Sequence, residues 1–176
     1  MTRRPFTIAR LTPIACAVIL IAGLTVFMHG RASSERRIFN DGTEALVTAG
    51  SIIEPAAGFP RPHELRADGE FFLTVPEGPT PLIVRSRLLI LTITGPSALR
   101  LTARSHETGE QVEVVSGRVV AKKNYASNYA EPDDLGPGEM SMVNQTIDLM
   151  EKETFDPAEA QVWSEQLRRR AGRSKP

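Results

Sequence analysis

The chain has 176 residues, with 21 Lys and Arg against 21 Asp and Glu, so its formal net charge at neutral pH is zero. This balance argues against attraction of the whole protein to nucleic acid. The single cysteine excludes an internal disulfide, and the about 145 residues after the hydrophobic N-terminus suffice for one domain but are too few for two.

The first predicted element is a membrane-spanning helix. A tail over residues 1–10 carries three arginines, and no charge follows from Leu11 to Met28. As a helix this run would extend about 27 Å, enough for a thin hydrocarbon core. It is longer than the apolar region of a usual signal peptide, which favours an uncleaved anchor over residues 11–29, and the small residues of Gly30 to Ala32 leave cleavage open.

Charge alone leaves the orientation of this helix nearly even. Arginines lie on both sides of it, and the amino terminus tilts the balance slightly towards a cytoplasmic tail. The residues alone therefore predict a single-pass helix after the tail over residues 1–10 and a polar linker over residues 30–37, and they leave the orientation open.

From residue 38 onward, short apolar runs alternate with turn-forming residues, which predicts β-strands. One or two strands lie in EALVTAGSII, with a turn at Gly50, and Phe71, Leu73 and Val75 share one face of the strand GEFFLTV. The later strands are predicted in PLIVRS, in LLILTIT as the central strand, in ALRLTAR after a turn at TGPSA, in QVEVVSGRVVAKK around a bend, and in MSMVNQTIDLM.

This spacing predicts an all-β domain over residues 38–155, as a small two-layer sandwich, a barrel or a solenoid-like domain. The stretch NYASNYAEPDDLGPGE is expected to be a long loop with a solvated acidic part.

A C-terminal helix is predicted over residues 156–172. Asp156 is placed to cap it, with Pro157 in the first helical position. Ala160, Trp163 and Leu167 lie on one face, so the tryptophan is expected to anchor the helix on the β-domain.

No pattern in the chain points to catalysis. His29, His63 and His106 lack metal-ligand spacing and are expected to be surface residues, and Cys16 lies in the membrane segment. We find no nucleophile elbow, phosphate loop, dinucleotide fingerprint or zinc-protease motif. The expectation is therefore a protein without enzyme activity, metal or cofactor.

An ordered set of short segments resembles the FecR domain. DGTEALVTAGSII, ELRADGEFFLTV, PLIVRS, TGPSALRL, VEVVSGRVVAKK and LGPGEMSMV follow one another as the family's segments do, and AQVWSEQL looks like its Trp-containing end. The matching positions are Asp41, Gly42, Ser51, Gly69, Glu70, Phe71, Phe72, Val75, Gly117, Val119, Gly138 and Glu139, with Gly95 and Trp163 in the accompanying segments.

For most of these positions we expect a packing role. One ring of the Phe71–Phe72 pair should enter the core, and the other should lie on the opposite face against a second layer or a partner. The resemblance implies a periplasmic domain, tethered to the inner membrane by one helix with residues 1–10 as a cytoplasmic tail, that regulates an extracytoplasmic sigma factor through another envelope or sigma-regulatory protein.

The chain departs from the family pattern in three places. Residues 1–10 are too few for the family's cytoplasmic sigma-binding region, we expect no further domain after Trp163, and Pro96 stands where the family commonly has Thr. We therefore expect a separately encoded partner to complete the circuit. The alternatives are an envelope structural or polysaccharide-binding module without a signalling role and, ranked last, an enzyme.

Overall fold

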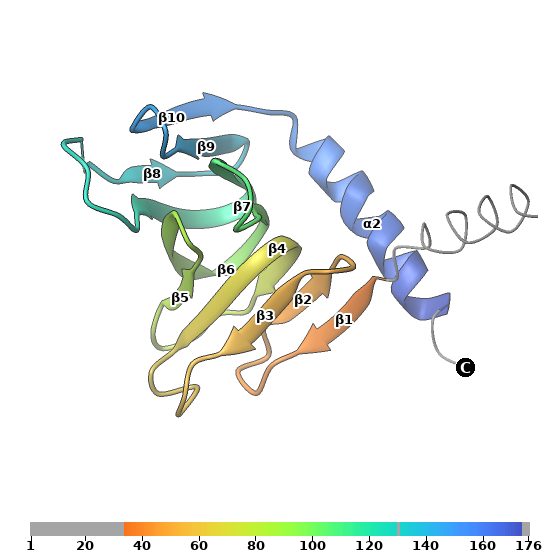
Figure 1. The fold of residues 1–176 in the computed structure, drawn as a ribbon. Coiled ribbons are helices and arrows are strands. Elements are labelled where there is room, and N and C mark those ends of the chain that lie inside the picture. The colour runs from red at the N-terminus through yellow and green to blue at the C-terminus, as the bar shows by residue number, and fades with distance from the viewer. Residues whose placement is uncertain (1–33, 130, 174–176) are drawn as a thin grey trace, which may run out of the picture. The chain divides into compact units, whose positions relative to one another are not determined.

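The computed structural model of the protein describes residues 34–129 and 131–173. These residues form ten strands in one hydrogen-bonded sheet, together with helix α2 (Figure 1). The elements are β1 (Glu35–Ile38), β2 (Glu44–Val47), β3 (Ile52–Pro55), β4 (Glu64–Val75), β5 (Leu82–Arg85), β6 (Leu89–Ala103), β7 (Gly109–Lys123), β8 (Asp133–Leu135), β9 (Glu139–Asn144), β10 (Leu149–Thr154) and α2 (Pro157–Arg173). The mostly β class with a C-terminal helix is confirmed.

The sheet is open and mixed, with the strand order β1-β2-β4-β5-β6-β7-β9-β10. Strand β3 pairs with β4, β8 pairs with β7, and β4 and β6 also pair directly. All pairs are antiparallel except β4 with β5. Within the described residues the strands form one sheet and not the two separate sheets of the predicted sandwich, because β6 and β7 are continuous and pair along both of their halves.

The expected turn at TGPSA is a bend inside strand β6. This strand has 15 residues and pairs with β7 on both sides of a register shift between Thr94 and Ala98. On β7 the bend falls at Gly117, as expected, where φ is +86°. A Cβ atom there would lie 2.0 Å from the Ser97 hydroxyl oxygen and 2.5 Å from the Pro96 carbonyl oxygen. Only glycine therefore lets the two bends lie against each other.

The main hydrophobic core lies on the inner face of the bent sheet. Apolar side chains at alternate positions of the strands form one buried cluster that includes residues from both halves of β6 and β7. Phe71, Leu73 and Val75 belong to it, as predicted, and so does Val119. The central place of β6 is also confirmed, since it pairs with β4, β5 and β7.

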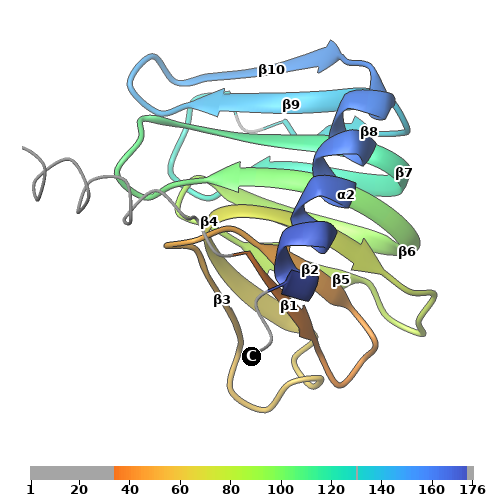
Figure 2. The same ribbon diagram turned by 90° about the vertical axis from the view of Figure 1, so that its right-hand side faces the viewer.

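Helix α2 covers part of the opposite, outer face and crosses the strands (Figure 2). A second cluster forms beneath it from Leu46, Phe72 and Val115 of the sheet and Ala160 and Leu167 of the helix, with Trp163 packed against it. The two neighbouring phenylalanines thus face opposite layers, as their alternation requires.

The helix is capped as predicted. The Asp156 carboxylate accepts a hydrogen bond of 2.9 Å from the backbone N–H of Ala158. The helix begins at Pro157 and ends at Arg173, one residue from the expected boundary at each end.

Two segments differ from their predicted state. Strand β1 begins at Glu35, inside the expected linker 30–37, because its backbone pairs with β2. Asp133 and Asp134 belong to strand β8 and not to a solvated loop; Ser141 donates a hydrogen bond of 2.7 Å to Asp133, and Arg118 forms an ion pair with Asp134.

Within residues 34–129 and 131–173, no helix has the length and apolar character needed to cross a membrane. The predicted anchor over residues 11–29, the tail 1–10 and His29 lie outside the described residues.

Candidate functional site

The motif residues of β4 are fixed by packing around one close contact. Gly69 has φ of +127°, and a Cβ atom there would lie 2.2 Å from the Ser51 hydroxyl oxygen. That hydroxyl accepts a hydrogen bond of 2.9 Å from the backbone N–H of Glu70. The glycine therefore lets the turn after β2 sit against β4, and this contact sets the register of the two phenylalanines that follow.

Glu70 is the centre of an ion-pair group on the outer face. Its carboxylate lies 2.6 Å from Arg100 and 3.1 Å from Arg104, and Arg100 also lies 3.6 Å from Glu113. The Arg100 guanidinium stands 4.5 Å from the ring centroid of Trp163, a cation–π contact. Glu70 and Trp163 are thus linked through one arginine, which joins the sheet to helix α2.

The remaining motif residues also have packing roles. A Cβ atom at Gly95 would lie 1.9 Å from the Pro76 carbonyl oxygen, so a loop passes directly over it. The backbone N–H of Gly138 donates to the Val114 carbonyl over 2.8 Å. The Glu139 carboxylate accepts a hydrogen bond of 2.7 Å from the backbone N–H of Gly136 and forms an ion pair with Lys152 at 2.9 Å.

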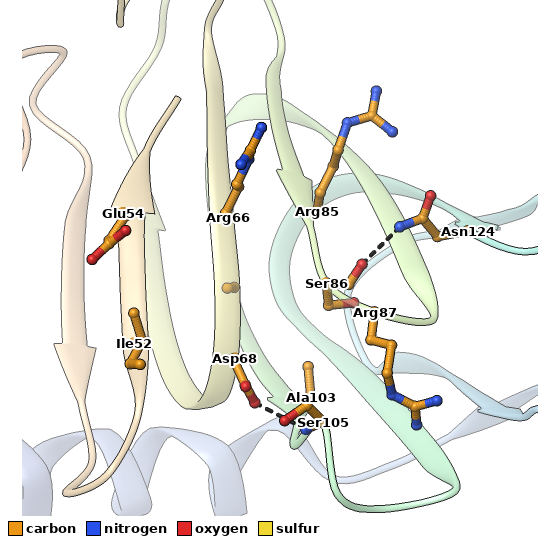
Figure 3. A pocket seen from close by; sticks show the side chains of 11 residues that line it. Ile52, Glu54, Arg66, Asp68, Arg85, Ser86, Arg87, Ala103, Ser105 and Asn124 are labelled. Carbon is orange, nitrogen blue, oxygen red and sulfur yellow. Dashed lines mark hydrogen bonds between the residues drawn. The ribbon is translucent and has the colours of Figure 1, made fainter. Parts of the chain in front are cut away.

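A groove of about 450 Å³ opens at the point where two strands part (Figure 3). Strand β4 pairs with β5 only as far as Arg66, and from Gly69 onward it pairs with β6 instead. Between them, Ala67 and Asp68 have no ladder partner on that side. The buried methyl groups of Ala67 and Ala103 line the groove, with Ile52 also on its lining.

Three arginines line this groove. Arg66 on β4 and Arg85 on β5 are direct neighbours in the parallel ladder, and Arg87 follows in the turn after β5 (Figure 3). Like charges placed directly opposite each other destabilise a sheet. Arg85 offsets this with an ion pair to Glu64 at 3.0 Å, and Arg87 donates to Gln145 at 2.8 Å.

Two acids share the lining, but neither neutralises Arg66. Asp68 accepts a hydrogen bond of 2.9 Å from the backbone N–H of Ser105, and hydrogen bonds from this residue hold the pKa of the Asp68 carboxyl below its usual value. Glu54 is the cross-strand neighbour of Arg66 on β3, yet its side chain turns away from it (Figure 3). Among the described residues, no ion pair or side-chain hydrogen bond involves Arg66.

A buried carboxyl group lies next to the groove. Glu110 is only 3% exposed; one of its oxygens accepts from the Ser86 hydroxyl, and the other has no hydrogen-bond partner. Burial raises the pKa of the Glu110 carboxyl, against the opposing effect of the bond from Ser86. The Ser86 hydroxyl also lies 3.1 Å from the Leu89 carbonyl, and one hydrogen cannot serve both acceptors fully. A protonated Glu110 would resolve this by donating to Ser86 itself.

His63 is not the surface residue that the sequence predicted. Its side chain is 15% exposed, its Nε2 lies 2.7 Å from the Asp41 carboxylate, and its Nδ1 lies 3.2 and 3.1 Å from the carbonyl oxygens of Thr80 and Pro81. Burial raises the pKa of Asp41, but hydrogen bonds from Thr43 and His63 outweigh it and hold that pKa below its usual value. His106 is exposed, as expected.

The His63 contacts line a second, larger cavity of about 870 Å³ beside five prolines. They tie three loops together, which explains the position of His63 without a catalytic role.

Sequence reasoning found the packing motifs but missed the arginine groove. Arg66, Arg85 and Arg87 lie in outward-facing or turn positions, which look like ordinary solvated charges. The pairing of β4 with β5 is what brings Arg66 and Arg85 together, and it is the only parallel pair among the strands of residues 34–129 and 131–173. A prediction of that register would have been needed to find the groove.

Comparisons with known proteins give a fold likeness. No protein-family model matches the chain, so the FecR resemblance stays a prediction. A search of curated proteins finds no match either. Two crystal structures from Parabacteroides distasonis ATCC 8503, at 1.65 Å and 2.50 Å resolution, of a protein described as "a putative anti-sigma factor" are similar to this chain, each with a TM-score of 0.65 and 21% identity. Each match covers 75% of this chain and 60% of the chain in the crystal structure.

Proposed function

We propose that this protein is a regulatory component of sigma-factor signalling of the FecR type, without enzyme activity, that acts through contacts with another protein. The observation that carries the proposal is the fold shared with a structure described as "a putative anti-sigma factor". At 21% identity the likeness concerns the fold, so the regulatory role comes to this chain by analogy.

The sequence motifs add independent support. Six short segments follow the order of the FecR pattern, and the structure gives a packing reason for motif residues in several of them: Gly69 admits Ser51, Phe71 and Phe72 serve opposite layers, and Gly117 fits the bend of β6. The proposal therefore places the β-domain and α2 in the periplasm, held to the inner membrane by residues 11–29.

The groove supplies a surface on which a partner can act. It is open and lined by charged side chains from three strands and one turn, as expected of a contact site and not of an enclosed catalytic pocket. The proposed partner is a sigma-regulatory or transport protein of the envelope.

Location and partner can be tested together in living cells. A reporter active only outside the cytoplasm is fused after Pro176, and the same cells are crosslinked and the captured proteins identified. The proposal expects an active reporter and a signalling protein among the crosslinked species. An inactive reporter would refute the periplasmic location. Capture of cell-wall polymer alone would favour the structural or polysaccharide-binding alternative.

A further inference from the structure

We propose that the groove between β4 and β5 binds an acidic, extended peptide segment of the partner protein, with Arg66 and Arg85 holding its carboxylates. This rests on the proposed function only in taking the ligand to be a protein. The argument comes from the placement of charge in the groove.

The first step is the arrangement of the two arginines. Arg66 and Arg85 are direct neighbours in the parallel ladder, where adjacent strands lie about 4.7–4.9 Å apart. One intramolecular carboxylate, Glu64, pairs with Arg85 at 3.0 Å, and none among the described residues pairs with Arg66. Two guanidinium groups held side by side repel each other, and one of them has no neutralising carboxylate. An external anion would therefore stabilise this arrangement.

The second step concerns the chemistry that these groups can recognise. A guanidinium presents its N–H donors in a planar fork that matches a carboxylate in bidentate fashion. Arg66 is exposed and makes no side-chain hydrogen bond within the described part of the chain, so its donors can all face a ligand. Arg87 also lines the groove, but its guanidinium already donates to Gln145 and to the Glu107 carbonyl.

The third step selects a peptide over a small anion. The groove holds about 450 Å³, within the range of sites for ligands much larger than phosphate. Its lining includes Ala67 and Ala103, which are buried and apolar, and Ile52, a residue that is 55% exposed. A segment that alternates acidic and apolar residues satisfies both features, because an extended chain presents alternate side chains in opposite directions.

The lining also sets limits on the ligand. Glu54 and Asp68 stand in the same groove, so a continuous polyanion such as nucleic acid would meet repulsion there. A peptide with spaced carboxylates can place them at the arginines and keep them away from these acids.

The test uses the full chain in detergent and two synthetic hexapeptides with blocked ends, Leu-Glu repeated three times and Leu-Gln repeated three times. Binding is measured by calorimetry for the wild type, Arg66→Gln and Arg61→Gln. Arg61 is a matched control, because it removes the same charge from the loop beside the other cavity. Inorganic phosphate is titrated separately, and folding of each variant is checked by circular dichroism.

We expect the Leu-Glu peptide to bind and the Leu-Gln peptide to bind about tenfold more weakly or not at all. Arg66→Gln should weaken Leu-Glu binding about tenfold, whereas Arg61→Gln should change it by less than about twofold. Equal binding of the two peptides, or equal effects of the two substitutions, would overturn the proposal. Binding of phosphate without peptide would also overturn it, in favour of a small-anion site.

Failure of this inference can be told apart from failure of the proposed function. If the peptide binds through Arg66 but crosslinking in cells captures no signalling protein, the groove is an acidic-peptide site and the function is wrong. If a signalling protein is captured equally by the wild type and by Arg66→Gln, the function stands and this groove is not its site.

Discussion

The bend shared by β6 and β7 provides a quantitative prediction for Gly117→Ala. The new Cβ atom would lie 2.0 Å from the Ser97 hydroxyl oxygen and 2.5 Å from the Pro96 carbonyl oxygen. Because a backbone atom is among these neighbours, a rotamer change cannot relieve the contact. A positive φ costs an alanine about 1–2 kcal/mol, and overpacking costs about 1–3 kcal/mol more. The expected loss is therefore about 2–5 kcal/mol in the free energy of unfolding, a large share of the about 5–15 kcal/mol typical of a domain.

Gly50→Ala is the matched control for this substitution. Gly50 also has a positive φ, +77°, but a Cβ atom there would have no neighbour within 4 Å. It should lose only the conformational part, about 1–2 kcal/mol. Urea unfolding of the full chain in detergent, followed by the fluorescence of the single tryptophan, Trp163, gives both values. If the two variants lose the same stability within about 0.5 kcal/mol, the account of the bend is refuted.

Three further predictions concern the carboxyl group next to the groove, the outer cluster and the helix cap. Burial raises the pKa of Glu110, so the stability tied to its neutral form is present at low pH and is lost as the pH rises through the folded-state pKa. Glu110→Gln should therefore raise Tm relative to wild type at pH 7 but not near about pH 4. An equal shift of Tm at both pH values would refute this. Phe72→Ala should lower the free energy of unfolding, measured in urea, by about 3–5 kcal/mol, because the buried Phe72 ring packs under α2. A loss below about 1 kcal/mol would mean that the contact with the helix adds little to stability. Asp156→Ala removes the hydrogen bond to the Ala158 N–H and should cost about 0.5–2 kcal/mol, and Asp156→Asn should restore most of the lost Tm.

Local chemistry predicted much of this fold. The alternation around Phe71 and Phe72 gave the two faces of β4, and the signals at Asp156 and Pro157 gave the start of α2. In each case the cause acts within a few residues, so it can be read from a single stretch of sequence.

The features that were missed depend on distant pairing. Gly95 and Pro96 have the local chemistry of a turn, but pairing with β7 on both sides keeps β6 continuous through them. The partners of His63 come from loops before β2 and before β5. Arg66 and Arg85 meet only through the parallel register of β4 and β5. None of these contacts leaves a signal in the residues beside it.

The most direct test of the proposed role in sigma-factor signalling is a map of transcription start sites. The map is made in a strain lacking this gene, in the same strain carrying the full chain, and in the parent. The proposal predicts that one group of promoters sharing a common recognition sequence changes when the gene is lost and returns when the chain is restored. An unchanged set of start sites, under conditions in which the protein is produced, would contradict it.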